Sequence, residues 1–265
     1  MKKMKIFIVT YNNATELNKT LTSLFESDLS SVDYQVFIIN NHSNFSIAEK
    51  FEGKVTVLHN VLRPDNSSGY LTRNWNQALI LGFGNLNEPD CDMVVAVQDD
   101  TVFYPRWTEY LLELHKKYSF ITYGWGDNFM SWTPEAVKQI GLWDESFQMS
   151  GHTSDYFLRA LIFNKTKSSI NDYYHKRVLN PEVFHIAGRP NNIKTHRNNI
   201  KTNTPYGKRK IGYKWGKIDG CSEMLTHWTD KLFNISDTIR PISHTPIMYP
   251  FFEDKVRTLK EQKYV

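Results

Sequence analysis

The sequence predicts an α/β fold in which helices cover a mostly parallel central sheet. Short apolar runs rich in β-branched residues alternate with helix-patterned segments in the first part of the chain, which is typical of strand–helix–strand units. The runs are nearly continuous, as in Lys5–Thr10 (KIFIVT) and Met93–Val97 (MVVAV), and this indicates strands buried on both faces. With 265 residues, 40% of them hydrophobic, the chain is long enough for one large domain with an extension.

The first part of the chain supplies four expected strands and two expected helices. Leu17, Leu21 and Leu24 recur at helical spacing after the first apolar run, so a helix is expected there. In order, we expect a strand over 5–10, a helix over 15–25, strands over 36–40 and 55–58, a helix through 75–82 and a strand over 93–97.

Beyond Pro105 the pattern changes and the elements become less regular. In order, we expect a helix over 106–118, a short strand near Ile121, an aromatic and glycine-rich loop over 123–132, helices beginning at Pro134 and spanning 154–163, an edge strand over 183–186 and a helix around 222–233. No repeat, low-complexity tract or Gly/Ser linker divides the chain. We therefore expect one domain, with a core over 1–188 whose halves are 1–104 and 105–188, and a basic C-terminal extension over 189–265.

Composition and charge exclude several classes of protein. The chain has 32 Lys and Arg against 28 Asp and Glu and 14% aromatic residues, which excludes disordered and fibrous proteins. No apolar run approaches the roughly 20 residues of a membrane-spanning helix, and the apolar run after Met1–Lys5 is too short for a signal peptide. We therefore expect a soluble, cytoplasmic protein. Cys91 and Cys221 show no metal or redox spacing, so both are expected to be buried, reduced thiols.

Polar clusters follow three of the expected strands: Thr10-Tyr11-Asn12, Asn40–Asn44 and Gln98-Asp99-Asp100. In sheets of this class, ligands bind at the carboxyl ends of the strands. Adjacent carboxylates repel one another unless a cation or strong donors neutralise them, and their oxygens suit Mg²⁺ or Mn²⁺. Asp99 and Asp100 are therefore either metal-binding residues or a pair that caps the next turn.

The segment Arg63–Asn76 (RPDNSSGYLTRNWN) is a loop that enters a helix. Gly69 gives the backbone freedom, and Arg73 and Asn74 lie near the helix start, an arrangement that favours a phosphate. The alternative is a capped surface helix with Arg73 in solvent. Neither a Walker loop nor a dinucleotide fingerprint occurs in the sequence.

His185 ends a short apolar run and leads into a basic segment. It is either a structural histidine, a metal ligand or a phosphate contact. Arg189–Lys217 contains nine basic residues and no Asp or Glu, which indicates one local anion. The aromatic residues of this segment also fit a groove for single-stranded nucleic acid, but no nucleic-acid-binding motif is present. We expect a mobile loop that closes over a diphosphate, and no nucleic-acid partner.

Polar candidates also precede the expected helix over 154–163. They lie in Gly141–Phe147 (GLWDESF) and His152–Asp155 (HTSD). Asp155 could cap that helix, or it could be a general base directed into a cleft.

In this order, the motifs resemble those of the GT-A fold glycosyltransferases, in particular glycosyltransferase family 2, over about Lys5–Gly188. The matching segments are Ile8–Asn12 (IVTYN), Ile39–Ser43 (INNHS), Asn66–Gly69 with Arg73-Asn74, Gln98–Asp100 (QDD), Gly141–Phe147, Ser154-Asp155 and His185–Gly188 (HIAG). Three positions depart from the family's pattern: Asn40 replaces the Asp that contacts the nucleobase, Gln98 the first Asp of the metal motif, and Ser154 the Glu of a Glu-Asp pair. The compact size is also similar to that of small transferases encoded by large algal viruses.

The resemblance implies an inverting glycosyltransferase that moves a sugar from a nucleoside diphosphate, UDP above all, to a hydroxyl of an oligosaccharide or glycoconjugate. It implies a nucleotide-sugar-binding half over 1–104 and an acceptor-side half over 105–188. Asp155 is then the catalytic base, with Asp127 as a second candidate, and Asp100 and His185 bind Mn²⁺ or Mg²⁺. The implied donor-binding residues are Thr10, Tyr11, Asn12, Asn40, Asn66, Gly69, Arg73, Asn74, Gln98 and Asp99, and the implied acceptor-binding residues are Trp125, Asp127 and Trp143.

Two other functions stay open at this point. A sugar nucleotidyltransferase would share the nucleotide-binding sheet, but it needs an N-terminal glycine-rich basic loop that the sequence lacks. A carbohydrate- or nucleotide-binding protein without catalysis would keep Trp125, Trp132 and Trp143 while needing no base. Hydrolysis of a nucleotide sugar separates the binding protein from the transferase.

Overall fold

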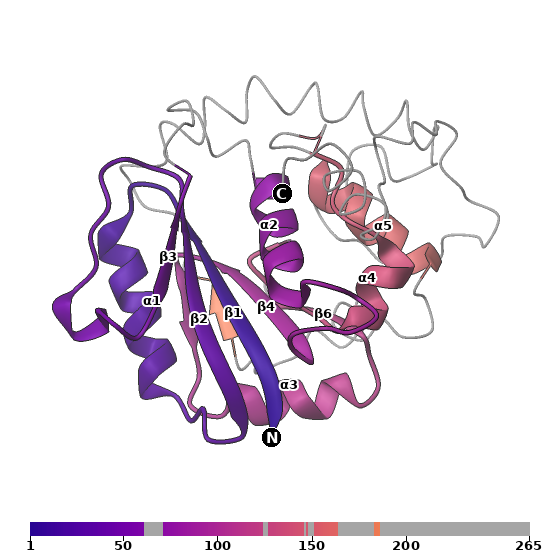
Figure 1. Ribbon diagram of the computed structural model, residues 1–265, viewed down its shortest axis with the longest axis horizontal. Helices are drawn as coiled ribbons and strands as arrows, with labels where there is room; N and C mark the ends of the chain where they lie inside the picture. The colour runs from indigo at the N-terminus through magenta and orange to yellow at the C-terminus, as the bar shows by residue number, and fades with distance from the viewer. Residues whose placement is uncertain (61–70, 124–126, 146, 148–150, 164–182, 186–265) are drawn as a thin grey trace.

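The computed structural model describes residues 1–60, 71–123, 127–145, 147, 151–163 and 183–185 (Figure 1). Its centre is a six-stranded sheet in the order β3-β2-β1-β4-β7-β6. The strands are β1 (Lys2–Thr10), β2 (Val32–Asn40), β3 (Thr56–His59), β4 (Met93–Gln98), β6 (Phe120–Tyr123) and β7 (Phe129–Trp132). The first four strands in this order pair in parallel, and β7 is antiparallel to both β4 and β6. The predicted α/β class with a mostly parallel sheet is confirmed.

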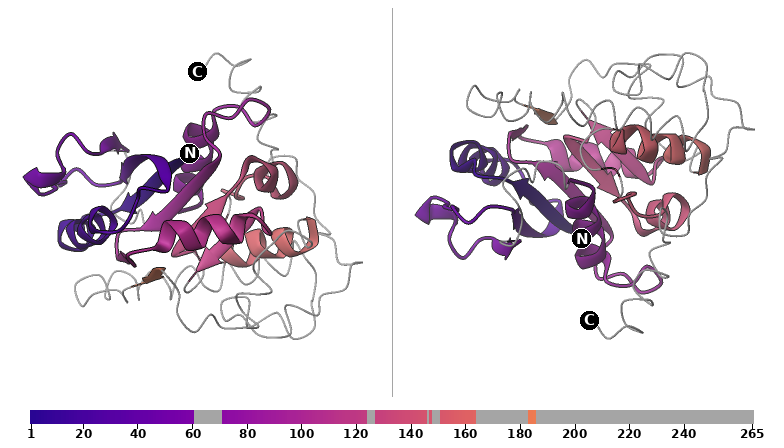
Figure 2. Two further views of the ribbon diagram at one scale, coloured as in Figure 1. Left: turned by 90° about the horizontal axis from the view of Figure 1, so that it is seen from below. Right: turned by 90° about the horizontal axis from the view of Figure 1, so that it is seen from above.

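Helices cover both faces of this sheet, as Figures 1 and 2 show. The helices are α1 (Ala14–Glu26), the short 3₁₀ helix η1 (Glu49–Phe51), α2 (Leu71–Phe83), α3 (Trp107–His115), α4 (Pro134–Ile140) and α5 (His152–Phe163). Alternate residues of β1 divide between two cores, because successive side chains of a strand point to opposite faces. Ile6 and Ile8 pack with α1 and α3, whereas Phe7 and Val9 pack with α2, α4 and α5. None of the described helices is long and apolar enough to cross a membrane.

Close packing of α2 on the sheet depends on Gly82. A Cβ atom at this position would lie 2.3 Å from Cγ2 of Val94 on β4, so no larger side chain fits without displacing the strand. Nearby, Cys91 is a buried free thiol, and burial raises its pKa to about 11. The prediction of a buried, reduced thiol therefore holds for Cys91, while Cys221 lies outside the described residues.

Two short strands were not anticipated. The segment expected as a loop over 123–132 contains β7, which pairs with both β4 and β6; that prediction is wrong for 129–132. A second sheet pairs β5 (Thr101–Phe103) with β8 (Val183–His185) in antiparallel fashion. β8 lies within the edge strand expected over 183–186, so the two strands that the sequence did not predict are β5 and β7. Both have three or four residues and gain their hydrogen bonds from partners distant in sequence, so local pattern carries little signal for them. The expected helix around 222–233 and the extension over 189–265 lie outside the described residues, and the proposed domain limits stay a prediction.

Acid is expected to destabilise the fold through His115 at the end of α3. Its ring lies 2.7 Å from the Ser131 hydroxyl through Nε2 and 3.0 Å from the Tyr118 carbonyl oxygen through Nδ1. Burial lowers the pKa of His115 to about 3. At pH values between about 3 and the unfolded pKa of about 6.5, the unfolded state binds more protons than the folded state. The stabilising effect of the neutral ring is therefore complete above about pH 6.5 and is lost as pH falls toward the folded pKa, with a slope approaching about 1.4 kcal/mol per pH unit.

Urea unfolding at about pH 7, 6 and 5 checks this expectation, because the slope of stability against pH reports the difference in bound protons. The comparison is between the wild type and His115→Gln, which lacks the titrating ring. The variant should be less stable at neutral pH and should lose less stability on acidification. Parallel pH profiles would assign the acid sensitivity to other groups.

Candidate functional site

The polar clusters predicted at the strand ends meet at one edge of the sheet, the upper edge in Figure 1. The ladder pairs Thr10 at the end of β1 with Asn40 at the end of β2, and Asn40 with His59 at the end of β3. On the other side of β1, Val9 pairs with Gln98, the last residue of β4. Because these four strands are parallel, their carboxyl ends bring the side chains of distant segments together.

Asp99 joins β1 to the turn after β4. Its carboxylate accepts hydrogen bonds from the Thr10 hydroxyl at 2.6 Å and from the Asn13 amide at 3.4 Å. Burial raises the pKa of Asp99 to about 7; the Thr10 hydroxyl opposes this rise and the neighbouring Asp100 charge adds to it. The carboxyl group therefore exchanges its proton close to neutral pH, and a cation or donor bound beside it would favour the ionised form.

Asn40 organises the loop that follows β2. Its side-chain amide donates to the His42 carbonyl at 2.7 Å and lies 3.1 Å from His59 Nδ1, while its side-chain oxygen accepts the His42 backbone N–H at 3.1 Å. Asn41, which the sequence did not single out, ties this loop to β1 through the Thr10 carbonyl. These bonds hold the ring of His42 edge-on to Tyr11, with centroids 5.1 Å apart.

Asn12 adopts a left-handed backbone conformation with φ of 48°, which asparagine tolerates better than most residues. It is exposed, and its side-chain oxygen accepts a hydrogen bond from Asn44 at 3.4 Å. One edge of the sheet therefore carries six of the residues predicted to bind the nucleotide sugar: Thr10, Tyr11, Asn12, Asn40, Gln98 and Asp99. The contact of each residue with the nucleotide sugar stays a prediction.

The first two turns of α2 contact the segment 143–145. Arg73 is exposed and lies 3.6 Å from the Glu145 carboxylate, while Asn74 is buried. Asn76, another residue that the sequence missed, donates to the Trp143 carbonyl at 2.9 Å and accepts the Trp143 backbone N–H at 2.7 Å. Asn66 and Gly69, which complete the predicted phosphate loop, lie outside the described residues.

The predicted metal ligands are Asp100, in the turn between β4 and β5, and His185, the last residue of β8. Asp100 is buried, with 8% of its surface exposed, and the next residue, Thr101, pairs with His185 across the β5–β8 ladder. The chain fold thus brings the backbone of His185 beside the Asp99–Asp100 turn, although the side chain of His185 is not described. Within the described ranges, no cluster of three or more His, Cys, Asp or Glu residues is formed. The basic segment Arg189–Lys217 lies outside these ranges.

A buried network joins Asp127, His152 and Trp75. Asp127 precedes β7, and its Oδ2 accepts a hydrogen bond from the Trp75 indole at 2.8 Å and lies 3.0 Å from His152 Nε2. Burial by itself would raise the pKa of Asp127, but His152 and the Trp75 N–H hold that pKa below its usual range. The sequence placed His152 beside Asp155, but no local pattern linked it to Asp127, because the two residues meet only in the folded chain.

Asp155 lies in the first turn of α5 and is fully buried. Its Oδ2 is 3.2 Å from Nε of Arg159, one helical turn later, and Arg159 also donates to the Ile140 carbonyl at 2.7 Å. Both side chains of this ion pair are at most 1% exposed. Arg159 thus links α5 to the last residue of α4, and Asp155 holds its guanidinium. To act as a base, Asp155 would have to leave this arginine.

Trp143 was predicted to contact the acceptor, yet it packs in the core. It is 1% exposed and stacks on Tyr156, with ring centroids 4.1 Å apart and planes 7° apart. Trp125, its predicted companion, lies outside the described residues. In this structure an acceptor cannot rest on the face of Trp143 that Tyr156 covers.

The chain shares a short segment with a bacterial transferase. It is 33% identical over 60 residues to the poly(ribitol-phosphate) beta-N-acetylglucosaminyltransferase TarP of Staphylococcus aureus, a match that covers 21% of this chain and 18% of TarP. No protein-family model matches the chain.

Solved structures give low-identity matches over a longer part of the chain. S. aureus TarS residues 1–349 matches at 14% identity with a TM-score of 0.43, and the match covers 59% of this chain and 56% of that TarS fragment. Glucosyl-3-phosphoglycerate synthase of Mycobacterium tuberculosis matches at 9% identity with a TM-score of 0.44, and the match covers 63% of this chain and 68% of the synthase. A mannosyltransferase of Pyrobaculum calidifontis, in complex with GDP-Man and Mn²⁺, matches at 9% identity with a TM-score of 0.41. This match covers 62% of this chain and 53% of the mannosyltransferase. The matched proteins are glycosyltransferases. The chain spans about a fifth of TarP, just over half of TarS 1–349 and about a third of the longer TarS chain.

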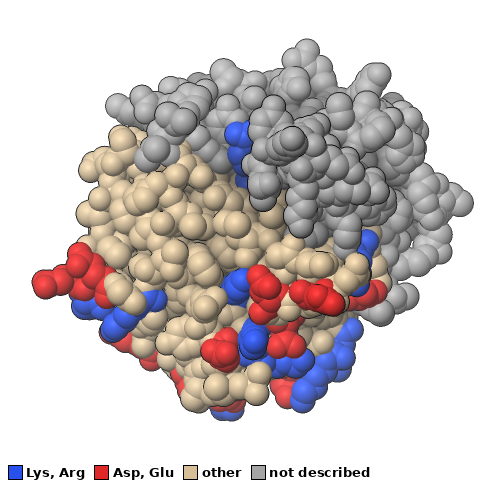
Figure 3. Space-filling view, viewed as in Figure 1, with Lys and Arg blue, Asp and Glu red and all other residues tan. Residues whose placement is uncertain are grey.

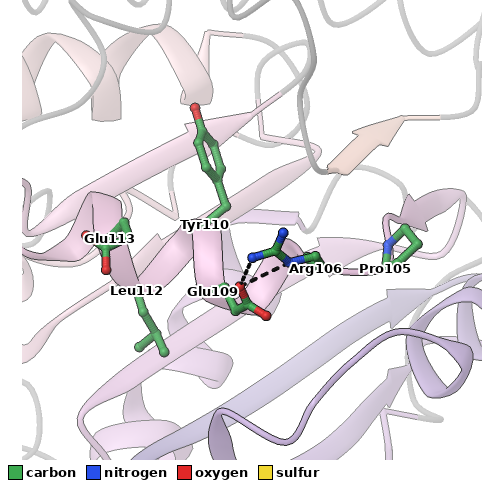
Figure 4. A pocket seen from close by; sticks show the side chains of 6 residues that line it. All are labelled: Pro105, Arg106, Glu109, Tyr110, Leu112 and Glu113. Atoms are coloured by element: carbon green, nitrogen blue, oxygen red, sulfur yellow. Dashed lines mark hydrogen bonds and ion pairs between the residues drawn. The ribbon is translucent and has the colours of Figure 1, made fainter.

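An open hollow lies on α3. None of the residues that line it belongs to the site predicted from the resemblance to glycosyltransferases. This hollow has a volume of about 730 Å³ and is lined by Pro105, Arg106, Glu109, Tyr110, Leu112 and Glu113. Figure 4 shows Arg106 paired with Glu109, three residues later in the chain. Figure 3 shows acidic and basic side chains interleaved on the lower part of one face. Ion pairs such as Lys2–Asp92 and Lys5–Asp90 compensate charge at the amino end of β1, opposite the polar edge.

Proposed function

We propose that the chain transfers a sugar from a nucleoside diphosphate donor to a hydroxyl of an oligosaccharide or glycoconjugate. The observation that carries this proposal is the meeting of Thr10, Asn40 and Asp99 at the carboxyl edge of a parallel sheet, where such sheets bind nucleotides. The order of the motifs along the chain and the 60-residue match to TarP support a sugar transferase. TarS is known in complex with UDP and with UDP-GlcNAc, so UDP is our first choice of nucleotide.

In this proposal the donor lies across the carboxyl ends of β1, β2 and β4. The segments Thr10–Asn12 and Asn40, with Gln98 and Asp99, contact the nucleoside. Arg73 and Asn74 bind the diphosphate at the start of α2, because backbone N–H groups and a guanidinium favour phosphate there. Asn66 and Gly69, which lie outside the described residues, are sequence-based candidates for the same role.

Asp100 and His185 are the residues that would hold Mn²⁺ or Mg²⁺. Carboxylate oxygen suits both ions, and His185 is the second ligand that the resemblance implies. Asp99 and Asp100 are adjacent carboxyl groups, which repel one another when both are ionised unless a cation neutralises them. When bound, the ion supplies positive charge against the leaving diphosphate. We further propose an inverting reaction by a single displacement, in which the acceptor hydroxyl loses its proton to a base of the chain as it attacks the sugar. The sequence-based candidate for this base, Asp155, stays a prediction.

A binding screen tests the proposed function. Thermal shifts report binding, because a ligand that binds the native state raises the apparent stability of the protein. The ligands are UDP-GlcNAc, other UDP-sugars, GDP-mannose and dTDP-glucose, each with and without Mn²⁺. UDP release from the donor that binds then separates a transferase from a binding protein without catalysis. A protein that binds none of these nucleotides would contradict the proposal.

The variant Asp100→Asn is expected to weaken Mn²⁺-dependent UDP binding by about tenfold or more, since even outer ligand partners of a metal matter by that factor. Its melting temperature without ligand should stay close to that of the wild type, because the substitution keeps the shape of the side chain. Isothermal titration with UDP and Mn²⁺ measures the change. Glu109→Gln on α3 removes a carboxylate outside the site and serves as the matched control. Equal UDP affinity in EDTA and in Mn²⁺ would exclude the metal at this position.

A further inference from the structure

The network of Asp127, His152 and Trp75 has a feature that packing alone does not explain. His152 is 6% exposed and Asp127 is 7% exposed, so both are largely withdrawn from water. Three separate elements supply the groups: α2 carries Trp75, the segment before β7 carries Asp127, and α5 begins with His152. Nδ1 of His152 is buried and has no hydrogen-bond partner within the part of the chain that the structure describes. A buried nitrogen of this kind costs about 1–3 kcal/mol if nothing binds to it.

The hydrogen bonds determine which nitrogen of His152 carries the proton. Oδ2 of Asp127 accepts the Trp75 N–H and faces His152 Nε2 at 3.0 Å. An ionised carboxylate only accepts hydrogen bonds, so Nε2 must donate. In the neutral ring, Nδ1 then bears a lone pair that can accept a proton. The ring is held in place by Asp127 on one side, and by Trp143, whose ring centroid lies 5.9 Å away.

We propose that His152 is the general base of the sugar transfer and that Asp127 is its positioning residue, an inference that rests on the proposed function. The acceptor O–H donates its proton to Nδ1 of His152. The acceptor oxygen forms a bond to the anomeric carbon of the sugar, and the bond from that carbon to the diphosphate oxygen breaks, with its electron pair leaving on the diphosphate. Asp127 stabilises the resulting imidazolium by accepting the hydrogen bond from Nε2–H of His152, as the aspartate of a Ser-His-Asp triad does for its histidine.

This assignment differs from the sequence-based one, and the contacts favour it. The Asp155 carboxylate is bound to a buried guanidinium, and its Oδ2 already accepts a hydrogen bond from Nε of Arg159. His152 lies three residues earlier in the same helix and faces a carboxylate instead. Nδ1 of His152 has no hydrogen-bond partner among the described residues, so its lone pair is not already engaged.

The test measures UDP release from UDP-GlcNAc in the presence of Mn²⁺, with water in place of the acceptor. His152→Gln retains an amide that can donate to Asp127 but has no basic nitrogen. We expect its turnover to fall by about 10²- to 10⁴-fold, with an affinity for UDP-GlcNAc within about threefold of the wild type, since the base acts in the transition state. His152→Ala should regain part of its turnover when imidazole is added, whereas wild-type turnover should not rise. A residue with a purely structural role would show no such rescue.

The outcomes separate the two proposals. If the wild type neither binds nor cleaves a nucleotide sugar, the proposed function fails and the base assignment fails with it. If the wild type releases UDP and His152→Gln does so at the same rate, only the base assignment is overturned. A folded but inactive His152→Ala that imidazole does not restore would also overturn it. Should His152→Ala not fold, the turnover of His152→Gln decides.

Discussion

Asp155→Asn is expected to reduce the free energy of unfolding by about 3–5 kcal/mol, because removal of one partner from a buried ion pair leaves an uncompensated charge. Asp155 and Arg159 are 0% and 1% exposed and lie 3.2 Å apart. The asparagine keeps the shape of the side chain but not its charge, so the Arg159 guanidinium would remain buried without an anion. Urea unfolding measures the loss.

A matched pair of controls isolates the effect of burial. Lys116→Ala removes a partner from the Lys116–Glu113 pair, whose side chains are 68% and 67% exposed, and an exposed pair of this kind contributes at most about 1 kcal/mol. The double variant Asp155→Leu with Arg159→Met removes both charges and should recover much of the stability that Asp155→Asn loses. If Asp155→Asn proves as stable as the wild type, the ion pair does not anchor α5. Loss of activity in this variant would by itself say nothing about a base.

Trp143→Ala is expected to cost about 3–5 kcal/mol, because truncating a buried tryptophan removes its contacts and leaves a cavity. Its ring is 1% exposed and stacked on Tyr156 at 4.1 Å, and an aromatic pair adds to the energy of burial. Trp143→Phe keeps a ring in the stack and should lose less stability. Chemical denaturation of the three proteins gives the order of stability directly. An alanine variant of wild-type stability would return Trp143 to the role of an acceptor contact.

The sequence by itself determined which segments form the parallel sheet. Runs such as Lys5–Thr10 and Met93–Val97 are apolar throughout, so they fit only a strand covered on both faces, and β1 and β4 contain these residues. It also determined the edge at which the polar clusters meet, because parallel strands end together. The pairing of Thr10 with Asn40 and of Val9 with Gln98 follows from that rule.

The tertiary structure alone decided which polar residue faces which partner. Asp127 and His152 lie 25 positions apart, and Asp155 and Trp143 looked like site residues because short motifs report residue type and order but not burial. Whether a carboxylate binds an arginine, a histidine or an indole depends on how α2, α4 and α5 pack over the sheet. That packing arises from nonpolar contacts spread over many segments of the chain, which no local spacing encodes. The chemistry of each buried group follows from its neighbours, and these neighbours exist only once the chain has folded.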